Sequence, residues 1–188
     1  RSLNDLSRRQ LPSGGFPWYP GGKDDLFMTL NVLEGLAQAK LYGIEIPKNL
    51  TDRAINYVMQ EVPELLTSER RDLTTLMYSS FILSSFGNDF TLAKERSDFT
   101  QKAMQFADKN SKNLAPIGLA YAAWIYNRLN DKTHAESYLA RALDGSGKDP
   151  VSGVYWAPEK NSWLWYNDSV GKHAFFLRVL LMMHPEDK

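Results

Sequence analysis

Apolar residues recur at helical spacing along most of the chain, in segments that glycine and proline separate. Steps of three and four connect the apolar positions of the clearest segment: Leu26, Leu30, Leu33, Ala37 and Leu41. Asp24 or Asp25 can cap its first turn, and Gly43 supplies a left-handed stop. The same pattern predicts seven helices: residues 25–42, 49–62, 72–86, 92–109, 116–130, 133–144 and 169–183. Residues 2–10 are expected to end a preceding helix, and no strand pattern competes.

Charge alternates from one predicted helix to the next. Residues 26–33, 74–87, 117–126 and 174–177 contain no charged side chain, so their helices should be buried on several sides. The helices between them carry charges and keep one apolar stripe: Asp52, Arg53 and Glu61, then Lys94, Glu95, Arg96, Asp98 and Lys102, then Glu136 and Arg141. An all-α fold of αα-hairpins in two layers follows, with the charge-free helices inside. A partial α/α toroid and a helical solenoid both fit.

Aromatic loops precede the first and the last of the inner helices. Residues 15–19 lead to Asp24 and Asp25, and residues 155–166 lead to the next caps at 167–169. The rings either plug one end of the helical layers or form a platform for sugar rings or a peptide. The candidate partner or ligand surface is Trp18, Tyr19, Trp163, Trp165 and Tyr166. Both loops are expected on the same rim.

Composition excludes several classes of function. A chain of 188 residues with 43% hydrophobic residues can form one folded domain, and residues 1–188 are expected to be one helical domain. Lys plus Arg and Asp plus Glu both number 22, so no basic excess favours nucleic acid. No apolar run approaches the roughly 18 residues of a membrane span, so a soluble segment is expected. Without cysteine, the chain has no disulfide and no thiol nucleophile.

Candidate catalytic chemistry is sparse. The three histidines, His134, His173 and His184, have no metal-ligand spacing, and we expect no metal and no cofactor. His173 alone lies near the start of an apolar inner helix. Asp24 and Asp25 are adjacent and point about 100° apart on a helix, so capping is favoured over a shared ion. No phosphate loop or nucleophile elbow is present, and we expect no catalytic residue.

Two stretches resemble a known family. Residues 9–22 (RQLPSGGFPWYPGG) and 29–39 (TLNVLEGLAQA) resemble the middle of the thioester domain of bacterial alpha-2-macroglobulin-like proteins. Residues 153–156 (GVYW) and 163–166 (WLWY) with the last helix are similar to its later part. The resemblance implies an α/α toroid in a large periplasmic or secreted protease-trapping protein. The family's reactive Cys-x-Glu-Gln thioester has no counterpart here, because the chain lacks cysteine.

The expected function is therefore a non-enzymatic helical domain of an alpha-2-macroglobulin-like endopeptidase inhibitor. Its partners would be other domains of a longer parent chain and, through the full-length protein, proteases; its location would be periplasmic or extracellular. The alternative is an α/α-barrel carbohydrate-active or isoprenoid-type enzyme with an aromatic-lined cleft. Convergent carboxylates in a deep cleft would favour that enzyme, and Asp24, Asp25 and His173 would be its first residues to mutate.

Overall fold

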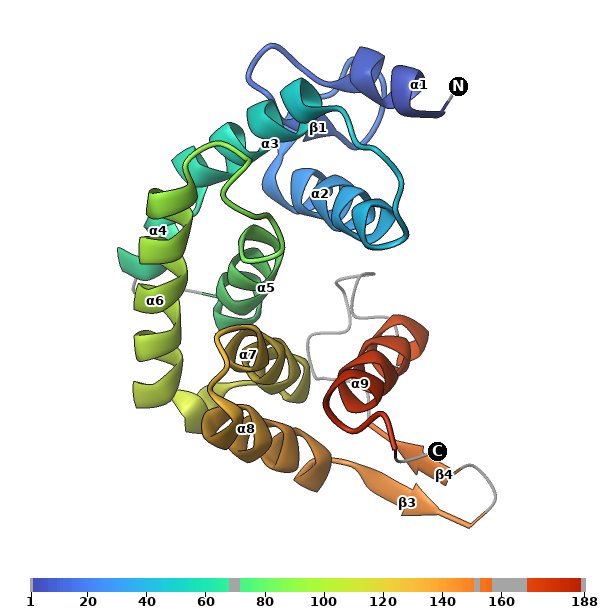
Figure 1. Ribbon diagram of the computed structural model, residues 1–188, viewed down its shortest axis with the longest axis vertical. Coiled ribbons are helices and arrows are strands. Elements are labelled where there is room, and N and C mark those ends of the chain that lie inside the picture. The colour runs from blue at the N-terminus through green and yellow to red at the C-terminus, as the bar shows by residue number, and fades with distance from the viewer. Residues whose placement is uncertain (1, 68–71, 151–152, 157–168, 187–188) are drawn as a thin grey trace. The chain divides into compact units, whose positions relative to one another are not determined.

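The computed structural model describes residues 2–67, 72–150, 153–156 and 169–186, and these residues are mostly helical (Figure 1). The helices are α1 (Ser2–Arg9), α2 (Leu26–Leu41), α3 (Lys48–Glu61), α4 (Pro63–Thr67), α5 (Leu73–Leu83), α6 (Ala93–Lys109), the 3-10 turn η1 (Ser111–Asn113), α7 (Pro116–Arg128), α8 (Lys132–Asp144) and α9 (Ser169–Met183). The predicted all-α fold is confirmed. Each of the seven predicted helices is present, with ends that differ by three residues or fewer.

The structure contains two short antiparallel strand pairs that the sequence pattern did not predict. Strands β1 (Phe16–Pro17) and β2 (Asp24–Asp25) pair Phe16 with Asp25. Strands β3 (Gly147–Asp149) and β4 (Gly153–Tyr155) pair Gly147 with Tyr155. Runs of two or three residues are too short to show an alternating pattern, so sequence periodicity could not reveal them.

Local signals explain where the helices begin. Asp25 precedes α2, and its Oδ1 accepts a hydrogen bond from the Met28 N–H at 2.8 Å. Asp72 caps α5 in the same way, and Asp131 caps α8. Helix α7 starts at Pro116, where a missing N–H costs nothing because first-turn amides have no helical partner. These contacts confirm that capping is the role of Asp25.

The structure divides into two compact units, residues 1–103 and 104–188. In the first unit, α2 packs against α3 and α5, and the β1–β2 ladder lies on α2. In the second unit, α7 packs against both α8 and α9 (Figure 1). Each unit is therefore built from neighbouring helices that pack in pairs. A toroid or a solenoid, and a single domain over residues 1–188, stay predictions.

Burial follows the charge pattern in most helices. Residues 76–83 of α5 are all buried, as are nearly all residues from 117 to 126 of α7. Helix α8 instead buries one stripe, Ala135, Tyr138, Leu139 and Ala142. Helix α9 departs from the expectation of an inner helix: Phe176 is buried, but Leu177 is 56% exposed. A charge-free run thus identified apolar surface without showing that all of it is covered.

Arg96 also departs from its predicted place. The sequence pattern put it among the charges of an outer helix, yet only 4% of its surface is exposed. Its guanidinium donates five hydrogen bonds to the backbone oxygens of Leu83, Phe86, Gly87, Phe90 and Thr91. The side chain thereby satisfies the end of α5 and the following loop, because the last carbonyls of a helix have no helical donor.

Candidate functional site

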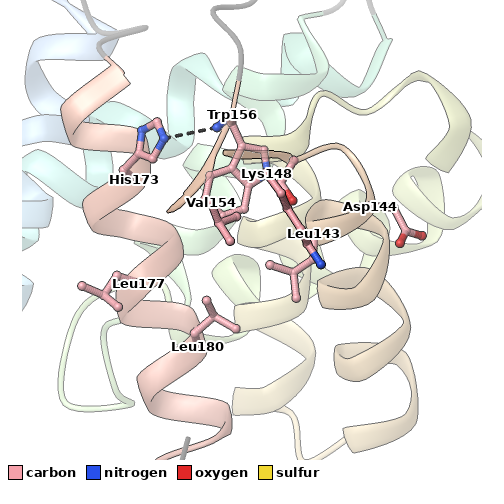
Figure 2. A pocket seen from close by; sticks show the side chains of 9 residues that line it. Leu143, Asp144, Lys148, Val154, Trp156, His173, Leu177 and Leu180 are labelled. Atoms are coloured by element: carbon pink, nitrogen blue, oxygen red, sulfur yellow. Dashed lines mark hydrogen bonds between the residues drawn. The ribbon is translucent and has the colours of Figure 1, made fainter. Parts of the chain in front are cut away.

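A pocket of about 700 Å³ lies in the second unit, between the end of α8, the β3–β4 hairpin and α9 (Figure 2). Its wall is mainly apolar: Leu143, Val154, Trp156, Leu177 and Leu180. Polar groups also line it: Asp144, Ser146, Lys148 and His173. A volume of this size and a few polar groups in an apolar wall are typical of small-molecule sites.

Contacts from both neighbouring helices hold Trp156 in the pocket wall. Its ring lies parallel to that of Phe176, with 3.9 Å between the centroids, and its Nε1–H donates to the Ala142 carbonyl oxygen at 2.8 Å. Only 8% of its surface is exposed. Because α8 and α9 both hold this indole, it fixes β4 against the two helices.

His173 lies at one end of the pocket, next to Trp156 (Figure 2). Its Nε2 accepts a hydrogen bond from the backbone N–H of Trp156 at 3.2 Å. This contact uses the imidazole tautomer whose proton is on Nδ1. The histidine that sequence reasoning singled out therefore lines a pocket, where it acts as a hydrogen-bond acceptor.

Asp144 and Lys148 are the charged groups of the pocket lining, and both are exposed. A glycosidase would need a second carboxyl group within roughly 5 to 9.5 Å of the first. Among the described lining residues, Asp144 supplies the carboxylate and no second acid accompanies it.

The first aromatic loop combines buried and exposed rings. Phe16 is 2% exposed, whereas Trp18 is 43% and Tyr19 is 68% exposed. Trp18 stacks on Phe27, with 6.0 Å between the ring centroids. The loop is therefore partly a plug, through Phe16, and partly an accessible aromatic surface, through the other two rings. On its other side, Phe27 contacts the ring of Tyr78, whose hydroxyl donates a hydrogen bond to the Glu34 carboxylate.

The remaining predicted surface residues, Trp163, Trp165 and Tyr166, lie outside the described residues. The second loop is described as far as Trp156, which is buried. That both loops share one rim stays a prediction, because they belong to different units.

The glycine-rich stretch before Phe16 is packed against α3. A Cβ on Gly14 would lie 2.2 Å from the Arg53 carbonyl oxygen, and Gly14 has φ +94°. A Cβ on Gly15 would lie 2.7 Å from the Cβ of Asp24 and 3.0 Å from the Tyr57 ring. Only glycine fits these two positions without displacing backbone or ring atoms.

The negative charges of Asp24 and Asp25 act on the hydroxyl of Tyr57, the α3 residue next to Gly15. Burial is the main cause that raises the pKa of Tyr57 to about 12, and the charges of Asp24, Glu61 and Asp25 raise it further. Asp24 and Asp25 therefore influence Tyr57 of α3, and Asp25 also caps α2.

The other histidines pair with acids. His134 Nδ1 lies 2.7 Å from Asp131 Oδ2, and His184 Nε2 lies 3.1 Å from Glu136 Oε2. Hydrogen bonds from the backbone and side chain of His134 keep the pKa of Asp131 below its usual range. Across the described ranges, no three His, Cys, Asp or Glu residues are grouped as a metal ion would require.

Asp108 joins three helices in a way that the sequence did not reveal. Its two carboxylate oxygens accept hydrogen bonds from the hydroxyls of Tyr126 at 2.6 Å and Tyr138 at 2.8 Å. Burial is the main cause that raises the pKa of both phenols, and Asp108 adds to it. Because the three residues come from α6, α7 and α8, this cluster ties the helices of the second unit together.

Trp124 lies in a cationic and aromatic environment. Arg128 and Arg178 approach its ring to 5.4 and 5.0 Å, and Phe175 stacks on it at 5.3 Å. Burial, with the charge of Arg178, lowers the pKa of Arg128 to about 10. These contacts fix α7 against α9 and make Trp124 part of the core, as predicted.

Neither a protein-family model nor a curated protein matches this chain. In the described part of the chain, none of the helices is both long enough and apolar enough to cross a membrane.

Proposed function

We propose that the chain is a non-enzymatic helical domain of an alpha-2-macroglobulin-like protease-trapping protein. The observation that carries this proposal is the structural role of the residues behind the resemblance. The glycine and aromatic stretch 9–22 and the helical stretch 29–39 lie in one packed unit, where the first leads into α2 and the second lies within α2.

A hydrogen-bond chain connects the two stretches. The Phe16 N–H donates to the Thr29 hydroxyl at 2.9 Å, and that hydroxyl donates to the Asp25 carbonyl oxygen at 2.7 Å. Gln10 ties the first stretch to α3 as well, since its Nε2 donates to the carbonyl oxygens of Gly14 and Leu50. The resembling residues therefore stabilise a scaffold, which is what a domain that positions other parts of a large inhibitor requires.

The acidic candidates for catalysis have structural assignments. Asp25 caps α2 through its side chain and accepts from Thr29 through its backbone. A covalent trap of the thioester kind needs a cysteine in this chain or elsewhere in its parent, and this chain has none. Trapping by the proposed protein therefore uses either steric enclosure or a thioester outside residues 1–188.

The coding sequence around residues 1–188 provides the first test. We expect an open reading frame that continues on both sides into further domains, including a protease-sensitive bait segment. Flanking domains that belong to a polysaccharide-degrading or isoprenoid enzyme would contradict the proposal.

The second test uses the parent protein and a trypsin-like protease. Enclosure should block cleavage of a large protein substrate while a small chromogenic peptide is still hydrolysed, because the peptide diffuses to a trapped active site. Equal loss of both activities, or of neither, would argue against trapping. Hydrolysis of glycosides or polysaccharides above a heat-killed control would instead favour the enzyme, and Asp24→Asn, Asp25→Asn and His173→Gln would then identify its site.

A further inference from the structure

The pocket of Figure 2 has an apolar body large enough for a ligand of several residues. Side chains from α9 line one side, and side chains from α8, β3 and β4 line the other. Leu177 is 56% exposed and Val154 is 48% exposed, so the apolar lining is accessible from solvent. Exposed apolar surface around a concavity favours a ligand with apolar side chains.

The charged groups of the lining have opposite signs and are separated along the chain. Asp144 is the last residue of α8, and Lys148 lies on β3. Among the described residues, neither the Asp144 carboxylate nor the Lys148 ammonium has a hydrogen-bond or ion-pair partner. The C-terminal end of α8 adds negative potential next to Asp144, because the carbonyl end of a helix carries partial negative charge. The pocket therefore offers an anionic position and a cationic position beside one apolar wall.

The distance between these positions limits the ligand. Three residues lie between Asp144 and Lys148, so four Cα-to-Cα steps limit the separation of their Cα atoms to about 14 Å. An extended tripeptide spans about 10 Å, and the two flexible side chains can make up the difference. A short peptide with free termini carries both charges at a separation below this upper limit.

The wall is also ordered before any ligand arrives. Stacking on Phe176 and hydrogen bonds to Ala142 and His173 hold Trp156 in place. A preorganised wall improves affinity because less side-chain freedom is lost on binding.

We propose that this pocket binds short peptides with apolar side chains and free termini. The peptide ammonium group lies near Asp144 and the end of α8, the carboxylate lies near Lys148, and the apolar side chains contact Leu177, Leu180 and Trp156. This binding does not depend on the proposed protease-trapping function, since it concerns a pocket within residues 104–188.

Trileucine is the probe, in three forms: free, N-acetylated and C-amidated. Calorimetry measures affinity, and the indole N–H signal of Trp156, assigned through Trp156→Phe, reports the place of binding in ¹⁵N-labelled protein. We expect millimolar or tighter affinity for the free peptide. Each capped form should bind about two to five times more weakly, which is the range for an exposed ion pair.

The variants separate the two ends of the peptide. Asp144→Asn should weaken the free peptide about two- to fivefold and leave the N-acetylated peptide unchanged. Lys148→Gln should weaken the free peptide similarly and leave the C-amidated peptide unchanged. Lys132→Gln, at the opposite end of α8, is the control and should change neither.

Leu177→Asp tests the apolar wall, and Leu181→Asp is its matched control, because Leu181 is 48% exposed on the same helix and does not line the pocket. We expect at least about tenfold weaker binding for Leu177→Asp and less than a twofold change for Leu181→Asp. Circular dichroism confirms that both variants fold. The proposal is wrong if trileucine gives no binding up to about 10 mM, if Leu177→Asp binds normally, or if octanoate binds more tightly than trileucine.

Discussion

Replacing Arg96 with alanine should destabilise the first unit more than any other charge removal on α6. The guanidinium donates to five backbone carbonyl oxygens, at 2.6 to 3.4 Å, and is 4% exposed. Alanine supplies no donor, and several of these carbonyls are too buried to be fully hydrated. A buried acceptor left without its donor costs about 1 to 3 kcal/mol, so losing several of these bonds together should cost about 3 to 5 kcal/mol, against a total stability of about 5 to 15 kcal/mol for a typical protein.

Arg96→Lys should fall between wild type and alanine. An ammonium keeps the charge, but its three donors cannot reproduce the planar fork that reaches carbonyls on both sides. We expect a loss of about 1 to 3 kcal/mol. Burial lowers the pKa of Arg96, with Asp52 and Asp89 opposing the shift, and a buried lysine would lose its charge more readily than arginine.

Urea unfolding followed by circular dichroism at 222 nm and by tryptophan fluorescence measures these losses. Lys102→Ala, an exposed change on the same helix, is the control and should stay within about 0.5 kcal/mol of wild type. A loss below about 1 kcal/mol for Arg96→Ala would refute the reasoning. It would mean that water replaces the guanidinium at these carbonyls at little cost.

Three further predictions concern the core, the glycine loop and pH. Trp124→Ala, at a residue that is 7% exposed, should cost about 3 to 5 kcal/mol in urea unfolding; a loss below about 1 kcal/mol would place Trp124 outside the core. Gly14→Ala should cost more than Gly21→Ala, because both have positive φ but a Cβ on Gly14 would lie 2.2 Å from backbone and one on Gly21 would meet nothing within 4 Å; equal melting temperatures would contradict the packing. Because the folded pKa of Tyr57 is raised to about 12, its contribution is complete below about pH 10 and is lost as pH rises toward 12; Tyr57→Phe should therefore flatten the decline of the unfolding free energy over that range, and an unchanged decline would count against it.

The helices could be predicted because their signals are local. Asp25 can cap α2, Pro116 can begin α7, and apolar spacing of three and four marks each buried face, all within a few residues of chain. The same signals predicted the all-α fold and the capping role of Asp25. The resemblance lies in such local features as well, since its glycines and aromatic residues shape the entry to α2.

The candidate site could be predicted only in part. His173 stood out as the histidine of an apolar helix, and Trp156 belonged to a recognised aromatic loop. Nothing local showed that the Trp156 N–H donates to His173 Nε2, 17 residues away, or that Asp144 and Lys148 line the same pocket. The β3–β4 pair places Lys148 and Val154 beside the end of α8 and beside α9, and strands of three residues are too short to show an alternating sequence pattern.

The sequence pattern predicted the helices, but it did not predict which polar side chains form tertiary hydrogen bonds. A run of charged residues predicts a solvated face, and α6 follows this rule except at Arg96, whose partners lie on α5 and in the loop after it. Asp108 stays exposed on the same helix, but its carboxylate accepts hydrogen bonds from the buried residues Tyr126 and Tyr138. The sequence determined the helices because capping and periodicity act within one segment. Which polar side chains are buried was decided by the tertiary structure, because a buried charge is stable only where distant segments supply its hydrogen bonds.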